Sequence, residues 1–255
     1  MSTVDEKLAK SLTAESTELI PYLPYLLQDL WELGSSPQDM IDLITKHASV
    51  SRRTRLLDLA CGKGAVSVNI ARTLGCSVKG IDILPEFIEF ARRKAAEYGV
   101  DALCEFEVGD INQAVKSETN YDIAILGAVG DVLGSSEKTI SLLKNTVKPG
   151  GYILIDDGYA KEQSNSHCLT RDAWLELFDA ARVTLVDEIL ITDDALSSLN
   201  VEQQECIRKR ANELKERLPR KAYLFDSYIA SQQAECDELE NEISGVTLLL
   251  RVDDR

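Results

Sequence analysis

The chain has 255 residues, 44% of them hydrophobic, which suffices for one large α/β domain or two small ones around a substantial core. It has no run of about 18 apolar residues and no signal-peptide core at its start, so we expect no membrane insertion and a cytoplasmic location. The formal net charge of −15 argues against a nucleic-acid partner, because such proteins usually present a basic groove.

Residues 1–50 precede the first predicted strand and are expected to form a helical N-terminal cap. Ser16 to Leu33 carries apolar residues at helical spacing, with two prolines that break or kink its start. Ser36 fits an N-cap followed by proline, and the second helix should run to about His47. Four polar or aromatic side chains of this segment are candidate pocket residues: Tyr22, Tyr25, Gln28 and Trp31.

Residues 54–65 have the pattern of a short buried strand, a carboxylate and a small-residue turn that opens a helix. Asp58 lies near the carboxyl end of the strand, and Gly62 and Gly64 remove side chains where a ligand presses against backbone. The helix that follows from Ala65 turns its free N–H groups toward the turn. An open α/β sheet builds a cofactor site at its strand ends in this way.

Glycine-rich turns also serve dinucleotide enzymes, but that pattern requires a third glycine where Ser67 stands. The run LLDLACGKG at 56–64 instead resembles motif I of the class I S-adenosylmethionine-dependent methyltransferases, which reads LDLGCGxG. Ala60 replaces the first glycine of that motif. Four further segments up to about residue 160 agree with the family in order and spacing.

The second and third segments end in acids. Residues 76–82 have the pattern of a strand ending in Asp82, followed by an amphipathic helix at 85–97. The resemblance implies that Asp82 accepts hydrogen bonds from both ribose hydroxyls and that Ile83 packs on the adenine. Residues 104–111 alternate like a strand and end in Gly-Asp. By the same resemblance Asp110 accepts from the adenine amino group, and the Ile111 N–H meets the ring.

The fourth and fifth segments are a buried strand at 121–128, which enters a small-residue loop, and a Lys-Pro-Gly-Gly turn before an apolar strand within 143–157. The family match therefore implies S-adenosylmethionine as the cofactor. The residues expected to hold it at the carboxyl ends of the strands are Asp58, Ala60, Gly62, Gly64, Asp82, Ile83, Asp110, Ile111 and Gly127.

The implied fold is a Rossmann-like, doubly wound, seven-stranded sheet whose last strand is antiparallel. We expect a single methyltransferase domain over 1–255, with its core at 51–194 and 244–255. Residues 195–243 should form a helical hairpin inserted before the last strand, with Asn200 capping its first helix and Pro219 dividing it. We interpret this insertion as a lid or an oligomer contact, and expect a homodimer in the second case.

Methyl transfer from a sulfonium is an in-line displacement, so the protein mainly positions and desolvates the reactants. A general base for an oxygen or nitrogen acceptor is expected at Asp131 or His167. No side-chain set has metal-ligand spacing, so we expect no catalytic metal. The favoured function is methyl transfer to a small molecule. The alternatives are a protein or RNA methyltransferase and a non-catalytic module that only binds the cofactor.

Overall fold

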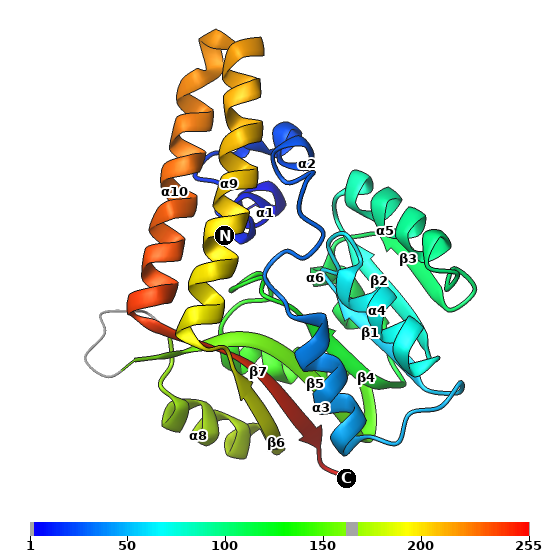
Figure 1. Cartoon of the computed structure of the whole chain (residues 1–255). Coiled ribbons are helices and arrows are strands. Elements are labelled where there is room, and N and C mark those ends of the chain that lie inside the picture. The colour runs from blue at the N-terminus through cyan, green and yellow to red at the C-terminus, as the bar shows by residue number, and fades with distance from the viewer. Residues whose placement is uncertain (1–2, 162–167, 255) are drawn as a thin grey trace. The chain divides into compact units, whose positions relative to one another are not determined.

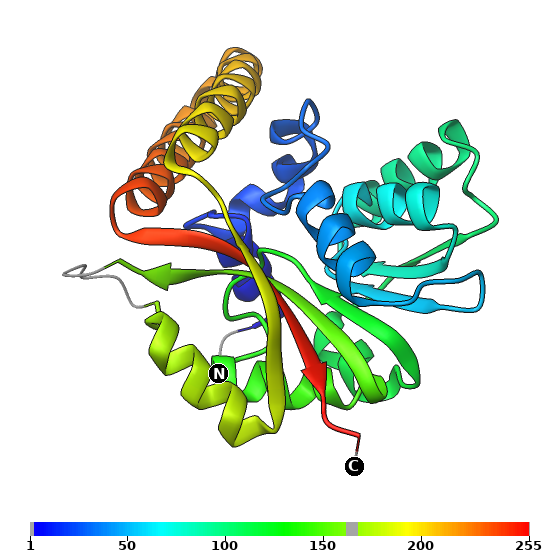
Figure 2. The same ribbon diagram turned by 60° about the horizontal axis from the view of Figure 1, so that its bottom comes forward.

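The computed structural model describes residues 3–161 and 168–254, and their strands form one seven-stranded sheet (Figure 1). The strand order is β3-β2-β1-β4-β5-β7-β6, and β7 is antiparallel to β6 (Figure 2). This topology confirms the expected fold class. The strands are β1 Arg55–Leu59, β2 Ser77–Asp82, β3 Cys104–Val108, β4 Tyr121–Leu126, β5 Val147–Ala160, β6 Val183–Leu190 and β7 Ile243–Val252.

The order of the strands determines where a ligand site can form. Strands β1 to β5 are parallel to one another, so their carboxyl ends meet along one edge of the sheet. From β1 the order runs outward through β2 and β3 on one side and through β4 and β5 on the other. In open α/β sheets, such a reversal between β1 and β4 is where connecting helices diverge and leave a crevice.

Helices cover both faces of the sheet. Helices α3 (Pro37–His47), α4 (Ala65–Leu74) and α5 (Pro85–Glu97) share one apolar core with the strands. On the other face lie α6 (Ile111–Ser117), α7 (Ser136–Lys144) and α8 (Arg171–Ala181) (Figures 1 and 2). Because both faces of β1 are covered, its leucines at 56, 57 and 59 are all fully buried, as expected for a central parallel strand.

Two compact units can be distinguished within the chain. The sheet unit comprises 31–158, 169–190 and 246–255, and the helical unit comprises 1–30, 159–168 and 191–245. The N-terminal segment and the inserted hairpin therefore belong to one structural unit, although they are far apart in the sequence. The division into a cap, a core and an insertion stays a prediction.

The helical unit is built from α1 (Val4–Ser11), α2 (Leu23–Leu26), α9 (Asp193–Arg217) and α10 (Ala222–Asn241), with 3-10 turns at 17–22 and 219–221. Pro21 lies inside the first 3-10 turn and Pro24 is the second residue of α2, so the prolines interrupt the long apolar stripe as expected. Helix α9 begins earlier than predicted, because Thr192 rather than Asn200 is its N-cap.

Helices α9 and α10 form an antiparallel hairpin (Figure 1). The buried residues of α9 recur every three or four positions, which produces a single seam: Leu196, Asn200, Gln204, Ile207, Ala211 and Leu214. The two polar members bond across to α10. Asn200 Nδ2 donates to Glu240 over 2.8 Å, and Gln204 Nε2 donates to the Cys236 sulfur over 3.3 Å. Asn200 therefore contributes to the hairpin seam and not to a helix end.

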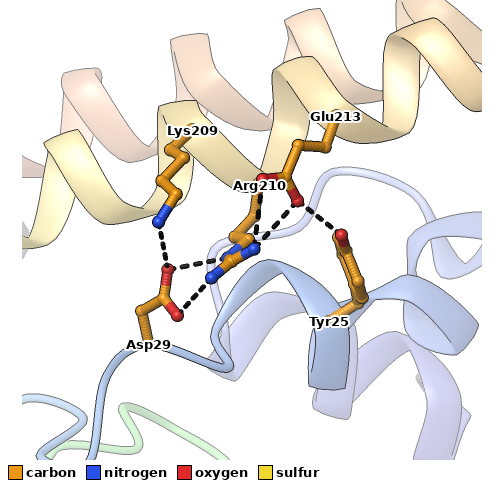
Figure 3. Close-up of polar contacts among 5 residues, drawn as sticks. All are labelled: Tyr25, Asp29, Lys209, Arg210 and Glu213. Carbon is orange, nitrogen blue, oxygen red and sulfur yellow. Dashed lines mark hydrogen bonds and ion pairs between the residues drawn. The ribbon is translucent and has the colours of Figure 1, made fainter.

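An ionic network attaches the N-terminal segment to α9 (Figure 3). The Arg210 guanidinium donates to both Asp29 carboxylate oxygens, over 2.7 and 2.6 Å, and to Glu213 over 2.9 Å. Glu213 in turn accepts from the Tyr25 hydroxyl. The planar, two-pronged geometry of arginine suits such bidentate pairing. Tyr22 packs edge-on against Phe225 of α10, so two of the aromatic pocket candidates bind the hairpin within their own unit.

The pairing of Asp29 with Arg210 leads to a charge-reversal prediction. Asp29→Arg and Arg210→Asp each place like charges together, so each single variant should lower the melting temperature and expose residues 1–30 to protease. The double variant restores an opposite pair and should recover much of both losses. Lys209→Ala is the control, because Lys209 is exposed and lies 3.8 Å from Asp29. If the double variant is no better than the singles, the pairing does not hold the segment in place.

Candidate functional site

A small cavity lies at the carboxyl ends of β1 and β4, within the sheet unit. Its volume is about 50 Å³. Four residues of the predicted cofactor set line it: Asp58, Ala60, Gly62 and Gly127. Trp31, from the N-terminal group of pocket candidates, lines it as well. The cavity therefore lies at the point where the strand order reverses.

The turn after β1 is a tight left-handed loop. Ala60, Gly62 and Gly64 have φ angles of 58°, 54° and 75°. The glycines adopt these values without strain, whereas the Ala60 side chain costs about 1 kcal/mol in this region. A Cβ atom on Gly64 would lie 2.7 Å from Ala91 Cβ of α5, so this glycine also permits close packing of the turn on α5. The turn places the first N–H groups of α4 toward the cavity edge.

Asp58 is 2% exposed and accepts a hydrogen bond from the Ser67 hydroxyl over 2.5 Å. Burial raises the pKa of Asp58 to about 7; the Ser67 bond lowers it, and the nearby Asp82 and Asp156 carboxylates raise it further. Ser67 stands where a dinucleotide motif has its third glycine. No sequence pattern identifies its hydroxyl as the partner of Asp58, because the two residues meet only once α4 has formed.

Asp82 connects the first two strand ends. Its carboxylate accepts from the Gly62 N–H and the Leu84 N–H, each over 2.9 Å. Burial raises the pKa of Asp82, and these backbone bonds oppose the shift. The acid predicted at the end of β2 therefore also supports the glycine turn. Ile83, half-buried, follows it directly.

Asp110 and Ile111 lie at the end of β3. The Asp110 carboxylate caps α6 by accepting from the Asn112 N–H over 2.8 Å, and Ile111 is buried at 5% exposure. The Gly109 N–H donates to the Asp82 carbonyl over 2.9 Å, which ties this turn to the end of β2. The structure thus places the acids of the second and third segments at adjacent strand ends.

Of the two candidates for a general base, only Asp131 lies within the described residues. Asp131 is exposed in the turn that follows β4, four residues after Gly127, and its carbonyl accepts from the Gly134 N–H. His167 lies outside the described residues. Neither candidate is placed by the structure against a reacting group, so the assignment of a base stays a prediction.

The sequence analysis did not identify two polar residues near the site, Ser35 and Asp156. Ser35 lines the cavity, and its Oγ accepts from the Ala128 N–H after β4 over 3.2 Å. Asp156 on β5 accepts from the Thr247 hydroxyl of β7 over 2.5 Å. Burial raises the pKa of Asp156 to about 6, while interactions with the Ser35 and Thr247 hydroxyls lower it. Ser35 has no sequence signal of its own, since it precedes the Ser36 cap.

Trp31 closes the cavity on the side of the glycine turn. Its indole Nε1 donates to the Lys63 carbonyl over 3.1 Å, and its ring stacks on Tyr98 with centroids 5.4 Å apart. Lys63 is only 3% exposed, and its ammonium lies 4.3 Å from the centre of the Phe90 ring. The turn is therefore enclosed by aromatic rings from two elements.

Within residues 3–161 and 168–254, no helix has the length and apolar character needed to cross a membrane. In the same part of the chain no three His, Cys, Asp or Glu side chains gather in a way that would hold a metal ion.

Comparison with known proteins identifies a family. A methyltransferase-domain family matches residues 51–216. A ubiquinone biosynthesis O-methyltransferase of Paraburkholderia phymatum is 33% identical over 111 residues, which are 44% of this chain and 47% of that protein. The chain thus spans about half the length of this curated relative.

Solved structures share the fold over most of the chain. A methyltransferase from Geobacter sulfurreducens in complex with S-adenosylhomocysteine superposes with a TM-score of 0.76 at 20% identity, covering 90% of this chain and 97% of the other. A methyltransferase from Thiobacillus denitrificans, also with S-adenosylhomocysteine, gives 0.74 at 19% identity over the same shares.

The raised pKa of Asp58 predicts a pH-dependent stability. The folded protein holds the Asp58 proton up to about pH 7, whereas an ordinary aspartate with a pKa of 3.8 loses it earlier. Between these values the folded state binds more protons, so the contribution of Asp58 falls as the pH rises. We expect Asp58→Asn, which can still accept from Ser67, to become more stable relative to wild type by on the order of 2–4 kcal/mol between pH 4 and 7.5.

Urea unfolding of both proteins across this pH range measures the difference, in which the other titrating groups cancel. Asp101→Asn, at an exposed position before β3, is the control and should run parallel to wild type. A wild-type curve parallel to that of Asp58→Asn would show that Asp58 titrates as an ordinary exposed acid.

Proposed function

We propose that this chain, which belongs to the methyltransferase-domain family, transfers a methyl group from S-adenosylmethionine to a small-molecule acceptor. The observation that carries the proposal is the bond from the Gly62 N–H to the Asp82 carboxylate at the cavity edge. It brings the glycine turn of β1 and the acid of β2 together, as a nucleoside site at the end of parallel strands requires. The resemblance of 50–160 to class I methyltransferases supports the same cofactor.

The residues present suit this cofactor. Gly62 and Gly127 line the cavity, and neither position has room for a side chain: a Cβ on Gly62 would lie 3.3 Å from Leu33, and one on Gly127 would lie 2.6 Å from Ser35. The cofactor supplies an electrophilic methyl group on a positively charged sulfur. The buried Asp58 carboxylate favours a cationic ligand, because a nearby positive charge offsets the burial that raises its pKa.

The remaining cofactor roles are proposals of the same kind. We assign the ribose hydroxyls to Asp82, and the adenine to Ile83, Asp110 and the Ile111 N–H. Ala60 and Gly64 shape the turn. Each Asp82 carboxylate oxygen accepts one hydrogen bond from a backbone N–H group. Each oxygen also has a second lone pair, which can accept a bond from a ribose hydroxyl.

A small molecule is the acceptor we favour. The net charge of −15 opposes binding to RNA, and the relative from Paraburkholderia phymatum is named a ubiquinone biosynthesis O-methyltransferase. We propose that residues 195–243 act as a lid or as an oligomer contact. A cytoplasmic location and a homodimer remain expectations. A protein or RNA methyltransferase, or a module that binds the cofactor without transfer, is distinguished by turnover on an acceptor panel.

Cofactor binding can be tested by titration of the wild type and of two site variants. We expect calorimetric titration to show binding of S-adenosylmethionine and S-adenosylhomocysteine but not NAD. Asp82→Asn replaces one acceptor oxygen by a donor, and Gly62→Val fills the turn at a left-handed φ. Each variant should lower the affinity for S-adenosylhomocysteine at least about tenfold, which corresponds to the free energy of one hydrogen bond to a charged group.

Asp101→Asn serves as the matched carboxylate control, and circular dichroism shows whether each variant folds. Binding of NAD alone would overturn the methyltransferase proposal. Unchanged affinity in both folded variants would overturn the site assignment.

Asp131 is the base we propose within the described residues. With an acceptor that must lose a proton, Asp131→Asn should lower kcat about 100-fold or more while the S-adenosylhomocysteine affinity stays that of wild type. Asp131→Glu should restore part of the rate, because it keeps a carboxylate at the position. A kcat within twofold of wild type in Asp131→Asn would exclude the residue as a base, and His167→Gln would then be the next variant.

A further inference from the structure

Charge is distributed unevenly along the hairpin of α9 and α10. Every lysine and arginine of residues 193–242 lies within 208–221, a stretch that carries seven basic and two acidic side chains. The flanking stretches 193–207 and 222–242 carry ten acidic side chains and no basic one. The basic stretch therefore stands out in a chain whose net charge is −15.

The antiparallel packing of the two helices gives the hairpin two ends of opposite charge (Figure 1). Asn200 bonds to Glu240, so the start of α9 lies beside the end of α10. The charged side chains of these two segments are all acidic, and together they form the acidic end of the hairpin. Residues 208–221 join the two helices and form the basic tip. The sign of the charge changes between Glu205 and Arg208, near the middle of α9.

One side of α9 is exposed and is not used to bind the N-terminal segment. Arg210, which holds Asp29 of that segment, lies two positions from Arg208 and therefore on another side of the helix (Figure 3). Arg208 belongs to a row of exposed residues at helical spacing, which we call the α9 row: Val201, Glu205, Arg208 and Asn212. Val201 is 57% exposed. The α9 row thus combines an uncovered apolar side chain with charges of both signs.

We propose that the α9 row is a contact between two copies of the chain, whose α9 helices pair antiparallel about a two-fold axis near residues 206 and 207. Such an axis places Glu205 of each copy opposite Arg208 of the other. It also places Asp194 of each copy near the level of Arg220 of the other. Both pairs form twice, because a two-fold contact is self-complementary. This contact is the second of the two roles proposed for the insertion, and it does not depend on methyl transfer.

The size and the charge pattern of the hairpin suit a second copy. A helix of 25 residues is about 37 Å long, and two helices side by side are roughly 20 Å wide. One face of the hairpin therefore measures roughly 700 Å², close to the ~800 Å² that each partner buries in a stable interface. An anionic membrane or a nucleic acid would match only the basic tip, and the acidic end would repel it. A second copy complements both ends at once.

Sedimentation of the full chain over a range of concentrations tests the contact. Wild type should approach the mass of two chains as the concentration rises. The Arg208→Glu/Arg220→Glu variant makes the contact positions uniformly acidic, and the Asp194→Arg/Glu205→Arg variant makes them uniformly basic. Each variant should raise the dissociation constant of the dimer at least about tenfold, because every pair of opposite charges becomes a pair of like charges.

A mixture of the two variants distinguishes a lost contact from a lost fold. In the mixed dimer each reversed position faces a position of opposite charge. An equimolar mixture should therefore recover the mass of two chains at concentrations where each variant alone is a monomer. Arg52→Glu/Arg53→Glu reverses two exposed charges that precede β1, so it is the matched control and should dimerise like wild type.

A wild type that keeps the mass of one chain at every concentration would overturn the contact. Variants that dimerise as wild type does would also overturn it. Monomeric variants that do not associate when they are mixed would exclude the antiparallel pairing. None of these measurements uses the cofactor or an acceptor, so a failure of the proposed methyl transfer would leave their result unchanged.

Discussion

The carboxyl ends of β1 and β2 are held together by the Asp82 carboxylate, which accepts from the Gly62 N–H of one turn and the Leu84 N–H of the next. The glycine turn has left-handed residues at 60, 62 and 64, and its conformation requires such external support. The start of α4, the clearance at Gly62 and the cavity wall all follow from this bond. Asp82 is buried, so the backbone donors also offset the cost of keeping a charge there.

Buried acids concentrate at this edge of the sheet. The pKa of Asp58 is raised to about 7 and that of Asp156 to about 6, in both cases mainly by burial. Such groups reduce stability at neutral pH, because the folded state resists their ionisation. Perturbed acids in a crevice are typical of functional sites, and a cationic ligand relieves the cost. The buried acids at the carboxyl ends of β1 and β5 therefore lower stability where they favour a cationic ligand.

The helical unit is held together by a different kind of contact. Its N-terminal segment binds the hairpin through exposed and half-buried polar groups centred on Arg210, while the hairpin itself has a narrow buried seam (Figure 3). Charged contacts of this kind specify a pairing more strongly than they stabilise it. The N-terminal segment and the hairpin of α9 and α10 therefore form one compact unit, although they lie far apart in the sequence.

Local patterns in the sequence determined most of the sheet unit. The buried run at 56–59, the proline before the helix at 85–97 and the Gly-Gly turn before β5 each specify their element by short-range sterics and periodicity, and the order of the motifs specified the topology. The positions of Asp58, Gly62, Asp82 and Asp110 at one edge followed from that order, because parallel strands align their carboxyl ends.

Only the tertiary structure decided which side chains meet across long separations in the sequence. Ser67 bonds Asp58, Ser35 reaches Ala128, and Arg210 pairs with Asp29 across 181 positions. A hydroxyl or a guanidinium has no periodicity that reveals its partner, since its bond depends on the approach of two elements. The same reason explains why Asn200 was taken for a cap: its residue type favours helix starts, but the packing of α9 on α10 placed it in a buried seam.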